Sequence, residues 1–206
     1  MNVQTALELN PLQVAGGSSS LVARLVSDVL CPPVVATLSI LVVAAHVATA
    51  TAWESAILFL ALVVIVPTLY LLWLLHRGEV TDFHLRVREQ RIKPMILVVT
   101  MTIGGWILLL VRQAPAMLVG VTTVGLAISI LLFLITLRWK ISGHTTAISG
   151  FVVLCLCLAG TSVAPLALSV PVGAWARVRL RCHTLAQTIV GAVLGLAVSF
   201  AFSVFH

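Results

Sequence analysis

Long apolar runs separated by short polar segments dominate the chain. About 20 apolar residues form a helix long enough to cross the hydrocarbon core of a bilayer. The pattern predicts membrane-spanning helices at residues 29–51, 54–75, 95–111, 116–137 and 184–205, with a further apolar stretch at residues 145–176. A β-barrel would instead show segments of about ten residues with alternating polarity. The sequence has no such segments, so the pattern predicts a bundle of helices.

The stretch at residues 145–176 has two interpretations. One tilted helix could take up most of it, or two short helices could meet near Gly160-Thr161 and Pro165. Each short helix would be slightly below the length that suffices for a span. Hydropathy alone therefore leaves six or seven spans open.

The N-terminal residues have a different character. Residues 1–20 contain no basic residue and no apolar core, so they do not resemble a signal peptide. We expect a polar tail at 1–20 and a single integral-membrane domain at 21–206. An interfacial stretch with Arg24 and Asp28 would lead into the first span, and Pro67 would kink the second.

Composition agrees with a membrane protein. The 206-residue chain is 61% hydrophobic and 9% charged, its mean hydropathy is +1.18, and soluble domains are about 25% charged. We therefore expect an all-α, polytopic transmembrane bundle. The four cysteines form no C-x-x-C pair, and we expect free thiols.

Positive charge gathers in three segments: 86–94 "RVREQRIKP", 138–144 "RWKISGH" and 177–183 "RVRLRCH". Such clusters often anchor helices at the membrane surface. His144 and His183, however, titrate near neutral pH and are not typical anchors. Ser142-Gly143 precedes a helix, whose exposed N–H groups can hold an anion. Gln187 lies one turn after His183, where its amide could orient the imidazole. These features favour an anion-binding site at Lys140 to His144 over an ordinary polar turn.

These segments resemble the motifs of the type 2 phosphatidic acid phosphatase superfamily. That family's motifs are K-x6-R-P, P-S-G-H and S-R-x5-H-x3-D, and the chain has "RVREQRIKP", "ISGH" and "ARVRLRCHTLAQ" in the same order. In the first motif Arg86 and Lys93 exchange the two basic residues. Ile141 replaces a proline, Ala176 a serine and Gln187 the final aspartate. The glutamine is similar to that of polyprenyl diphosphate phosphatases, which indicates an isoprenoid substrate.

The resemblance implies a lipid phosphatase with a phosphohistidine intermediate. His183 would attack phosphorus, His144 would protonate the leaving oxygen and then activate water, and Gln187 would orient His183. The phosphate-binding residues would be Arg86, Arg88, Arg91, Lys93, Ser142, Gly143 and Arg177. No metal or other cofactor is expected. We expect the carboxylates Glu79, Asp82 and Glu89 to pair with arginines.

A shared site also predicts a topology. The three motifs must face one side, so residues 145–176 would cross twice, giving seven spans and an N-terminus on the site side. Of the twelve Lys and Arg residues, only Arg112 would then lie opposite, which favours a site on the cytoplasmic face. We expect a prokaryotic cell membrane, with the bilayer and a phosphorylated lipid as partners and no nucleic acid. The oligomeric state stays open.

Other functions fit the same residues. A lipid phosphotransferase would pass the phosphoryl group from His183 to a second lipid or alcohol. The substrate could instead be phosphatidic acid or phosphatidylglycerophosphate. An anion transporter would need ionisable residues within the spans, where His46 is the clear candidate. An inactive relative that binds phospholipid is the remaining alternative.

Overall fold

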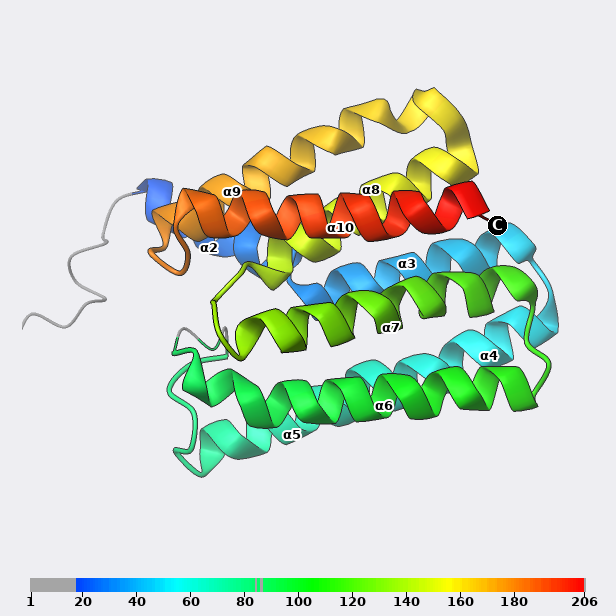
Figure 1. Cartoon of the computed structure of the whole chain (residues 1–206), viewed down its shortest axis with the longest axis horizontal. Coiled ribbons are helices and arrows are strands. Elements are labelled where there is room, and N and C mark those ends of the chain that lie inside the picture. Colours follow the sequence, from blue (N-terminus) through cyan, green and yellow to red (C-terminus); the bar gives the residue numbers. More distant parts are fainter. Residues whose placement is uncertain (1–17, 84, 86, 206) are drawn as a thin grey trace, which may run out of the picture.

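The structure, a computed structural model, describes residues 18–83, 85 and 87–205. All regular elements in this part of the chain are helical (Figure 1). They are α2 (Ser18–Val29), α3 (Pro32–Val47), α4 (Ala50–Leu60), the π-helical turn η1 (Ala61–Ile65), α5 (Val66–His76), the 3-10 turn η2 (Glu89–Arg91), α6 (Ile92–Val111), α7 (Ala116–Thr136), α8 (Gly143–Ala159), the 3-10 segment η3 (Gly160–Leu168), α9 (Ser169–Arg179) and α10 (Leu185–Phe205).

The helices have the length and composition of membrane spans. Five helical segments are long and apolar enough to cross a bilayer, and the bent pair of α2 and α3 can count as a sixth. The prediction of an all-helical membrane protein is confirmed at this level. The first predicted span corresponds to α3, and the stretch expected to lead into it forms α2. The two helices meet at 43°, where Pro32 and Pro33 begin α3. Of the expected tail, Ser18–Ser20 are helical.

Pro67 lies inside a continuous helical segment, Ala50–His76. Proline lacks an N–H and cannot donate to the carbonyl one turn earlier, so it disturbs the regular α-helical pattern. The π-helical turn Ala61–Ile65 comes immediately before it. The wider turn is a recognised cause of helix bending, and α5 then continues to His76.

The segment Gly143–Arg179 runs out along the bundle and returns (Figure 1). Helix α8 ends at Ala159, and Gly160 follows with a φ of +67°, a left-handed conformation that favours glycine. The 3-10 segment η3 with Pro165 then leads into α9. Ser27 contacts both His144 at the start of α8 and Arg177 at the end of α9. Both ends of the segment therefore lie at one end of the bundle, called here the site end.

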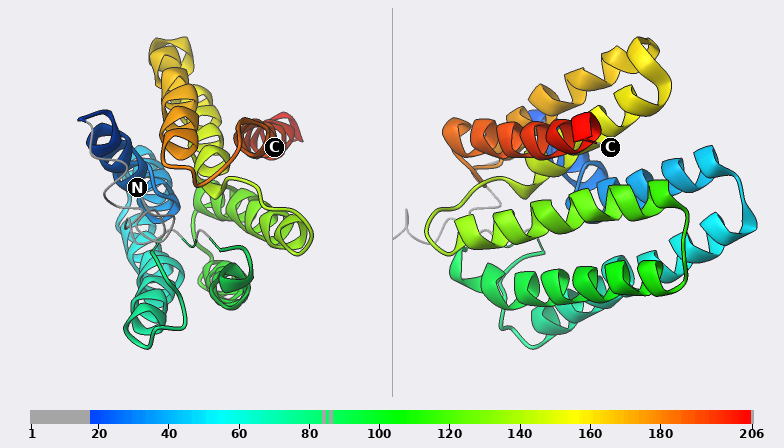
Figure 2. Two further views of the ribbon diagram at one scale, coloured as in Figure 1. Left: turned by 90° about the vertical axis from the view of Figure 1, so that its left-hand side faces the viewer. Right: turned by 45° about the vertical axis from the view of Figure 1, so that its right-hand side comes forward.

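Helix α8 occupies the centre, packed against α3, α9 and α10 (Figure 2). Two glycines of α10 allow its closest contact. A Cβ atom added at Gly191 would lie 2.5 Å from the carbonyl oxygen of Ser142, and one added at Gly195 would collide with the carbonyl oxygen of Thr146 and with Ser149 Oγ. Small residues four apart let membrane helices approach this closely.

Hydrogen bonds between helices accompany this contact. Thr145 Oγ1 donates to the Thr188 carbonyl oxygen at 2.9 Å, and Ser149 Oγ donates to that of Ala192 at 3.0 Å. In hydrocarbon such bonds add to van der Waals packing, by about 0.6 kcal/mol each on average. The α8–α10 pair is thus held in one register by polar as well as steric contacts.

The end of the bundle opposite the site is apolar. Its buried core comprises Ile40, Val43, Ala44, Ala52, Ala56, Phe59, Leu109, Ala114 and Leu118. Gly105 of α6 meets Phe59 and Val63, leaving no room for a Cβ atom. This core fixes α3, α4, α6 and α7 at one end, while buried polar side chains gather at the site end.

We predict that Gly195→Ala destabilises the protein by about 1–3 kcal/mol, the typical effect of overpacking, because its methyl group collides with backbone of α8. Thermal unfolding in detergent would measure this. Gly104→Ala is the matched control, since its Cβ atom would lie 3.8 Å from Leu62 Cδ2, an ordinary contact. Equal melting temperatures for the two variants would contradict the close packing of α8 on α10.

Candidate active site

The candidate site forms where three loops and α2 meet at the site end (Figure 2). Arg91 comes from η2 before α6, His144 from the first turn of α8, and His183 from the connection between α9 and α10. All three are buried, with exposed fractions of 8%, 7% and 6%. The structure thus brings one residue of each predicted motif together.

The end of α9 explains the spacing between Arg177 and His183. The N–H of Cys182 donates to the Arg177 carbonyl oxygen, the N–H of Arg181 donates to that of Val178, and Arg181 has a φ of +53°. This is the hydrogen-bond pattern of a Schellman motif. It turns the chain back over the last helical turn, and the His183 N–H also donates to the Arg177 carbonyl oxygen at 3.3 Å.

Gln187 connects His183 to the start of α10. The Thr184 N–H donates to Gln187 Oε1 at 3.1 Å, and the Gln187 N–H donates to Thr184 Oγ1 at 3.3 Å, which is a reciprocal capping box. Gln187 Oε1 also lies 3.3 Å from His183 Nδ1. The start of α10 therefore holds the Gln187 amide in contact with the imidazole. The spacing of His183 and Gln187 in the sequence predicts this contact.

The partners of His183 define its tautomer. Gln187 Oε1 can only accept, so His183 Nδ1 carries the proton and donates to it. Arg91 Nη2 can only donate, and it lies 3.4 Å from His183 Nε2. Both contacts are satisfied by one neutral form of the ring. That form has the Nε2 lone pair directed toward the guanidinium of Arg91.

Burial and positive charge keep His183 neutral. Burial is the largest cause, and the nearby charges of Arg91, Arg177 and Lys140 add to it, lowering the pKa of His183 from 6.5 to about 3. Burial likewise lowers the pKa of Lys140, and Arg91 and Arg177 contribute. Three cations thus converge on one neutral imidazole, an arrangement suited to an anion.

Arg91 and Arg177 are fixed by contacts within the protein. Arg91 Nε donates to the Leu85 carbonyl oxygen at 2.7 Å, and Nη1 donates to that of Ile141 at 3.3 Å. Arg177 Nη1 donates to Ser27 Oγ at 2.7 Å. The buried guanidinium groups are therefore preorganised beside His183, which is the property that an anion site requires.

Ser142 and Gly143 begin helix α8. Ser142 Oγ accepts from the Thr145 N–H at 3.4 Å, as an N-cap. The Ser142 N–H donates to the Gln187 carbonyl oxygen at 3.1 Å, which links α8 to the start of α10. Gly143 and His144 line the cavity described below. The positive end of α8 therefore faces the space beside His183.

Two other predicted phosphate-binding residues, Arg88 and Lys93, make contacts away from His183. Arg88 Nη1 donates to the Arg138 carbonyl oxygen at 3.0 Å, just after α7. Lys93 Nζ pairs with Glu79 at 2.8 Å on an exposed surface. The hydrogen bond from Lys93, the largest cause, lowers the pKa of Glu79. Arg86 lies outside the described residues. Among the first-motif cations that the structure describes, Arg91 is the one that contacts His183.

A large cavity extends from the site into the bundle. Its volume is about 1110 Å³, and Arg91, His144, Arg177 and His183 lie among its lining residues. A drug-sized ligand pocket commonly has 300–1,000 Å³. The cavity therefore combines a cationic group with space for a large molecule.

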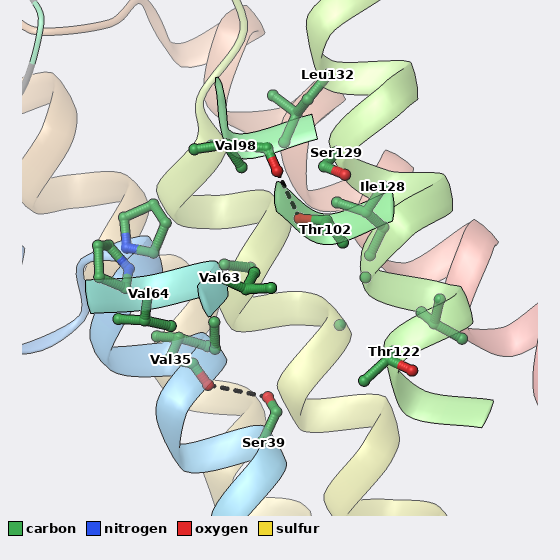
Figure 3. A pocket seen from close by; sticks show the side chains of 18 of the residues that line it. Val35, Ser39, Val63, Val64, Val98, Thr102, Thr122, Ile128, Ser129 and Leu132 are labelled. Atoms are coloured by element: carbon green, nitrogen blue, oxygen red, sulfur yellow. Dashed lines mark hydrogen bonds between the residues drawn. The ribbon is translucent and has the colours of Figure 1, made fainter. Parts of the chain in front are cut away.

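The walls away from the site are mostly hydrocarbon (Figure 3). Ser39 and Thr102 line them, but each hydroxyl donates to a carbonyl of its own helix, Val35 and Val98 respectively. Thr136 and Ser199 also line the cavity, and their hydroxyls have no hydrogen-bond partner among the described residues. The cavity is thus suited to an apolar chain.

Ser27 contacts two site residues, His144 and Arg177, and the sequence does not predict these contacts. The sequence predicts that the stretch around Ser27 lies at the membrane interface. Nothing in local spacing connects it to His144 or Arg177, which follow more than a hundred residues later.

In the part of the chain that the structure describes, no three His, Cys, Asp or Glu side chains gather as a metal site would need.

The chain was also compared with protein-family models, curated proteins and solved structures, and none of the three comparisons gave a match.

We predict that His183 stays neutral, with its proton on Nδ1, down to about pH 4, because its pKa lies near 3. Arg91→Met should raise that pKa by removing a neighbouring cation. Nitrogen NMR of the imidazole measures both the tautomer and the titration. Lys93→Gln is the control and should leave the titration unchanged. Titration of wild-type His183 near pH 6.5 would contradict the buried, cation-flanked geometry.

Proposed function

We propose that the protein is an integral membrane lipid phosphatase that hydrolyses a phosphomonoester or diphosphate of a lipid, preferably an isoprenoid. One observation carries the proposal: a neutral imidazole with its Nε2 lone pair beside buried arginines, at one end of a cavity with hydrocarbon walls. The cations match a phosphate, and the cavity matches a lipid tail. The ordered resemblance of the three motifs to a phosphatase superfamily supports the same function.

The geometry supports a two-step reaction. His183 Nε2 attacks phosphorus, and the bond from phosphorus to the leaving oxygen breaks. This is the lipid oxygen of a monoester or the bridging oxygen of a diphosphate, and protonated His144 gives it a proton. Water then attacks the phosphohistidine, His144 takes up its proton, and phosphate leaves as His183 is restored. Arg91 and Arg177 stabilise the charge on the non-bridging oxygens throughout, which is the main requirement of phosphoryl transfer. Gln187 keeps Nε2 directed at the substrate.

We further propose that the chain crosses the membrane seven times. The crossings are α3, the continuous α4–α5, α6, α7, α8, α9 together with η3, and α10. Each of α8 and α9 is a separate crossing because Ser27 contacts the start of one and the end of the other. The N-terminus and the site then share a face, proposed to be cytoplasmic in a prokaryotic cell membrane.

We predict phosphate release by the purified protein from prenyl diphosphate, prenyl phosphate, phosphatidic acid or phosphatidylglycerophosphate, without an added acceptor and in the presence of EDTA. Isoprenoid substrates should be turned over fastest, because Gln187 stands where the polyprenyl diphosphate phosphatases also have a glutamine. The panel compares isoprenoid lipids with glycerolipids, which carry ester carbonyls near the head group. His183→Ala should abolish release, since it removes the nucleophile.

Two variants of the first motif serve as a matched pair. Arg91→Gln should lower kcat/KM by about 100-fold or more, as loss of a transition-state donor does. Lys93→Gln should stay within a few fold of wild type, because Lys93 is exposed and pairs with Glu79. Substantial turnover by folded His183→Ala protein would refute the covalent reaction, and a requirement for Mg²⁺ would refute its metal-free form.

The topology is tested without knowing the substrate. In a background free of native cysteines, we predict that Lys140→Cys and Arg181→Cys react with an impermeant maleimide from one side of sealed vesicles. Glu54→Cys and Ser162→Cys should react from the other side, because each lies at the end of the bundle away from His183. Labelling of positions 140 and 181 from opposite sides would exclude a shared site.

A further inference from the structure

Helix α2 delivers a serine to the site from outside the three motifs. Its inner face carries Ala23 and Ser27, with exposed fractions of 0% and 1%. Its outer face carries Leu21 and Leu25, with exposed fractions of 66% and 65%. A helix with one apolar outer face at the end of a membrane bundle fits the boundary between head groups and acyl chains. The inner face then points toward the site.

Ser27 contacts two site residues that come from different helices. Its hydroxyl oxygen accepts from Arg177 Nη1 at 2.7 Å. Its carbonyl oxygen lies 3.2 Å from His144 Nε2, and its hydroxyl oxygen lies 3.4 Å from the same nitrogen. Through these contacts with Arg177 and His144, α2 joins the end of α9 to the start of α8.

The carbonyl contact determines which nitrogen of His144 carries a proton. A carbonyl oxygen only accepts, so His144 Nε2 must donate to it. In the neutral ring Nδ1 is then the nitrogen that takes up a proton, and in the cation it is the nitrogen that can give one to a substrate. A third group that orients the ring of a catalytic base is a recurring arrangement in enzymes.

The hydroxyl contact determines how the guanidinium of Arg177 lies. Arg177 is 1% exposed, and a hydrogen bond to a charged, buried group contributes more than one between neutral groups. If α2 only needed to pack closely, alanine would suffice, as Ala23 does one turn earlier. The hydroxyl of Ser27 therefore has a role beyond packing.

We propose that Ser27 is a positioning residue of the site: its hydroxyl holds Arg177 and its carbonyl oxygen holds His144. The roles of Arg177 and His144 rest on the function proposed above. Helix α2 is accordingly part of the phosphate site as well as an interfacial helix. The guanidinium of Arg177 is therefore oriented before an anion binds beside His183.

Binding of inorganic phosphate tests the proposal separately from hydrolysis. The measurement is the rise in melting temperature of the full-length protein in detergent as phosphate is added, at constant ionic strength set with chloride. Ser27→Ala should weaken phosphate binding about tenfold, because the guanidinium of Arg177 loses the hydrogen bond from Nη1 to Ser27 Oγ. Thr37→Ala is the control: its hydroxyl donates to the Pro33 carbonyl of its own helix at 2.8 Å, so binding should match wild type.

A double-mutant cycle shows whether Ser27 acts through Arg177. In an Arg177→Met background, Ser27→Ala should weaken phosphate binding no further. Where hydrolysis is observed, Ser27→Ala should lower kcat/KM by 10- to 100-fold. Ser27→Thr, which keeps the hydroxyl, should recover part of that loss.

Each result decides a different point. Wild-type phosphate binding by Ser27→Ala, or an equal loss in the presence and absence of Arg177, overturns the positioning role. Phosphate binding that depends on Ser27 and Arg177, without hydrolysis of any lipid, refutes the phosphatase and supports the role of Ser27. A wild-type protein that binds no phosphate overturns both.

Discussion

The contact between α8 and α10 determines the geometry of the candidate site. Gly191 and Gly195 let α10 approach the backbone of α8, and any side chain at these positions would separate the two helices. His144 is in the first turn of α8, and His183 immediately precedes α10. The distance between the two histidines therefore depends on this one register. Close packing in a low-dielectric interior transmits such displacements, because protein interiors have few voids to absorb them.

The second constraint is electrostatic. Burying Arg91 and Arg177 beside each other costs free energy, and an unpaired buried cation is expensive. The protein offsets part of that cost with carbonyl oxygens and with the Ser27 hydroxyl. These groups have no net charge. Burial keeps His183 neutral, and the charges of Arg91, Arg177 and Lys140 add to its effect. The cations proposed to bind phosphate therefore also help to keep the lone pair of His183, the proposed nucleophile, unprotonated.

Much of this architecture could be predicted from the sequence. Apolar runs predict the helices because hydropathy and length suffice for that, and Gly160 with Pro165 indicates the turn between α8 and α9. The spacing from Arg177 to His183 follows from local backbone hydrogen bonds. Residues two apart on a helix point about 200° away from each other, so Arg91 and Lys93 cannot both face His183. The sequence does not indicate which of the two does so. Ser27 could not be predicted either, because its contacts are entirely tertiary.

The distribution of charge is consistent with the orientation proposed above. Cations that bind phosphate are poor indicators of membrane topology, because the site needs them on whichever side of the membrane it lies. With Arg91, Arg177 and Lys140 set aside as site residues, the described cations that remain at the site end are Arg24, Arg77, Arg88, Lys93, Arg138, Arg179 and Arg181. At the opposite end Arg112 lies 3.7 Å from Glu54. The charge asymmetry is therefore independent of the site, and the excess of Lys and Arg on cytoplasmic loops favours a site that faces the cytoplasm.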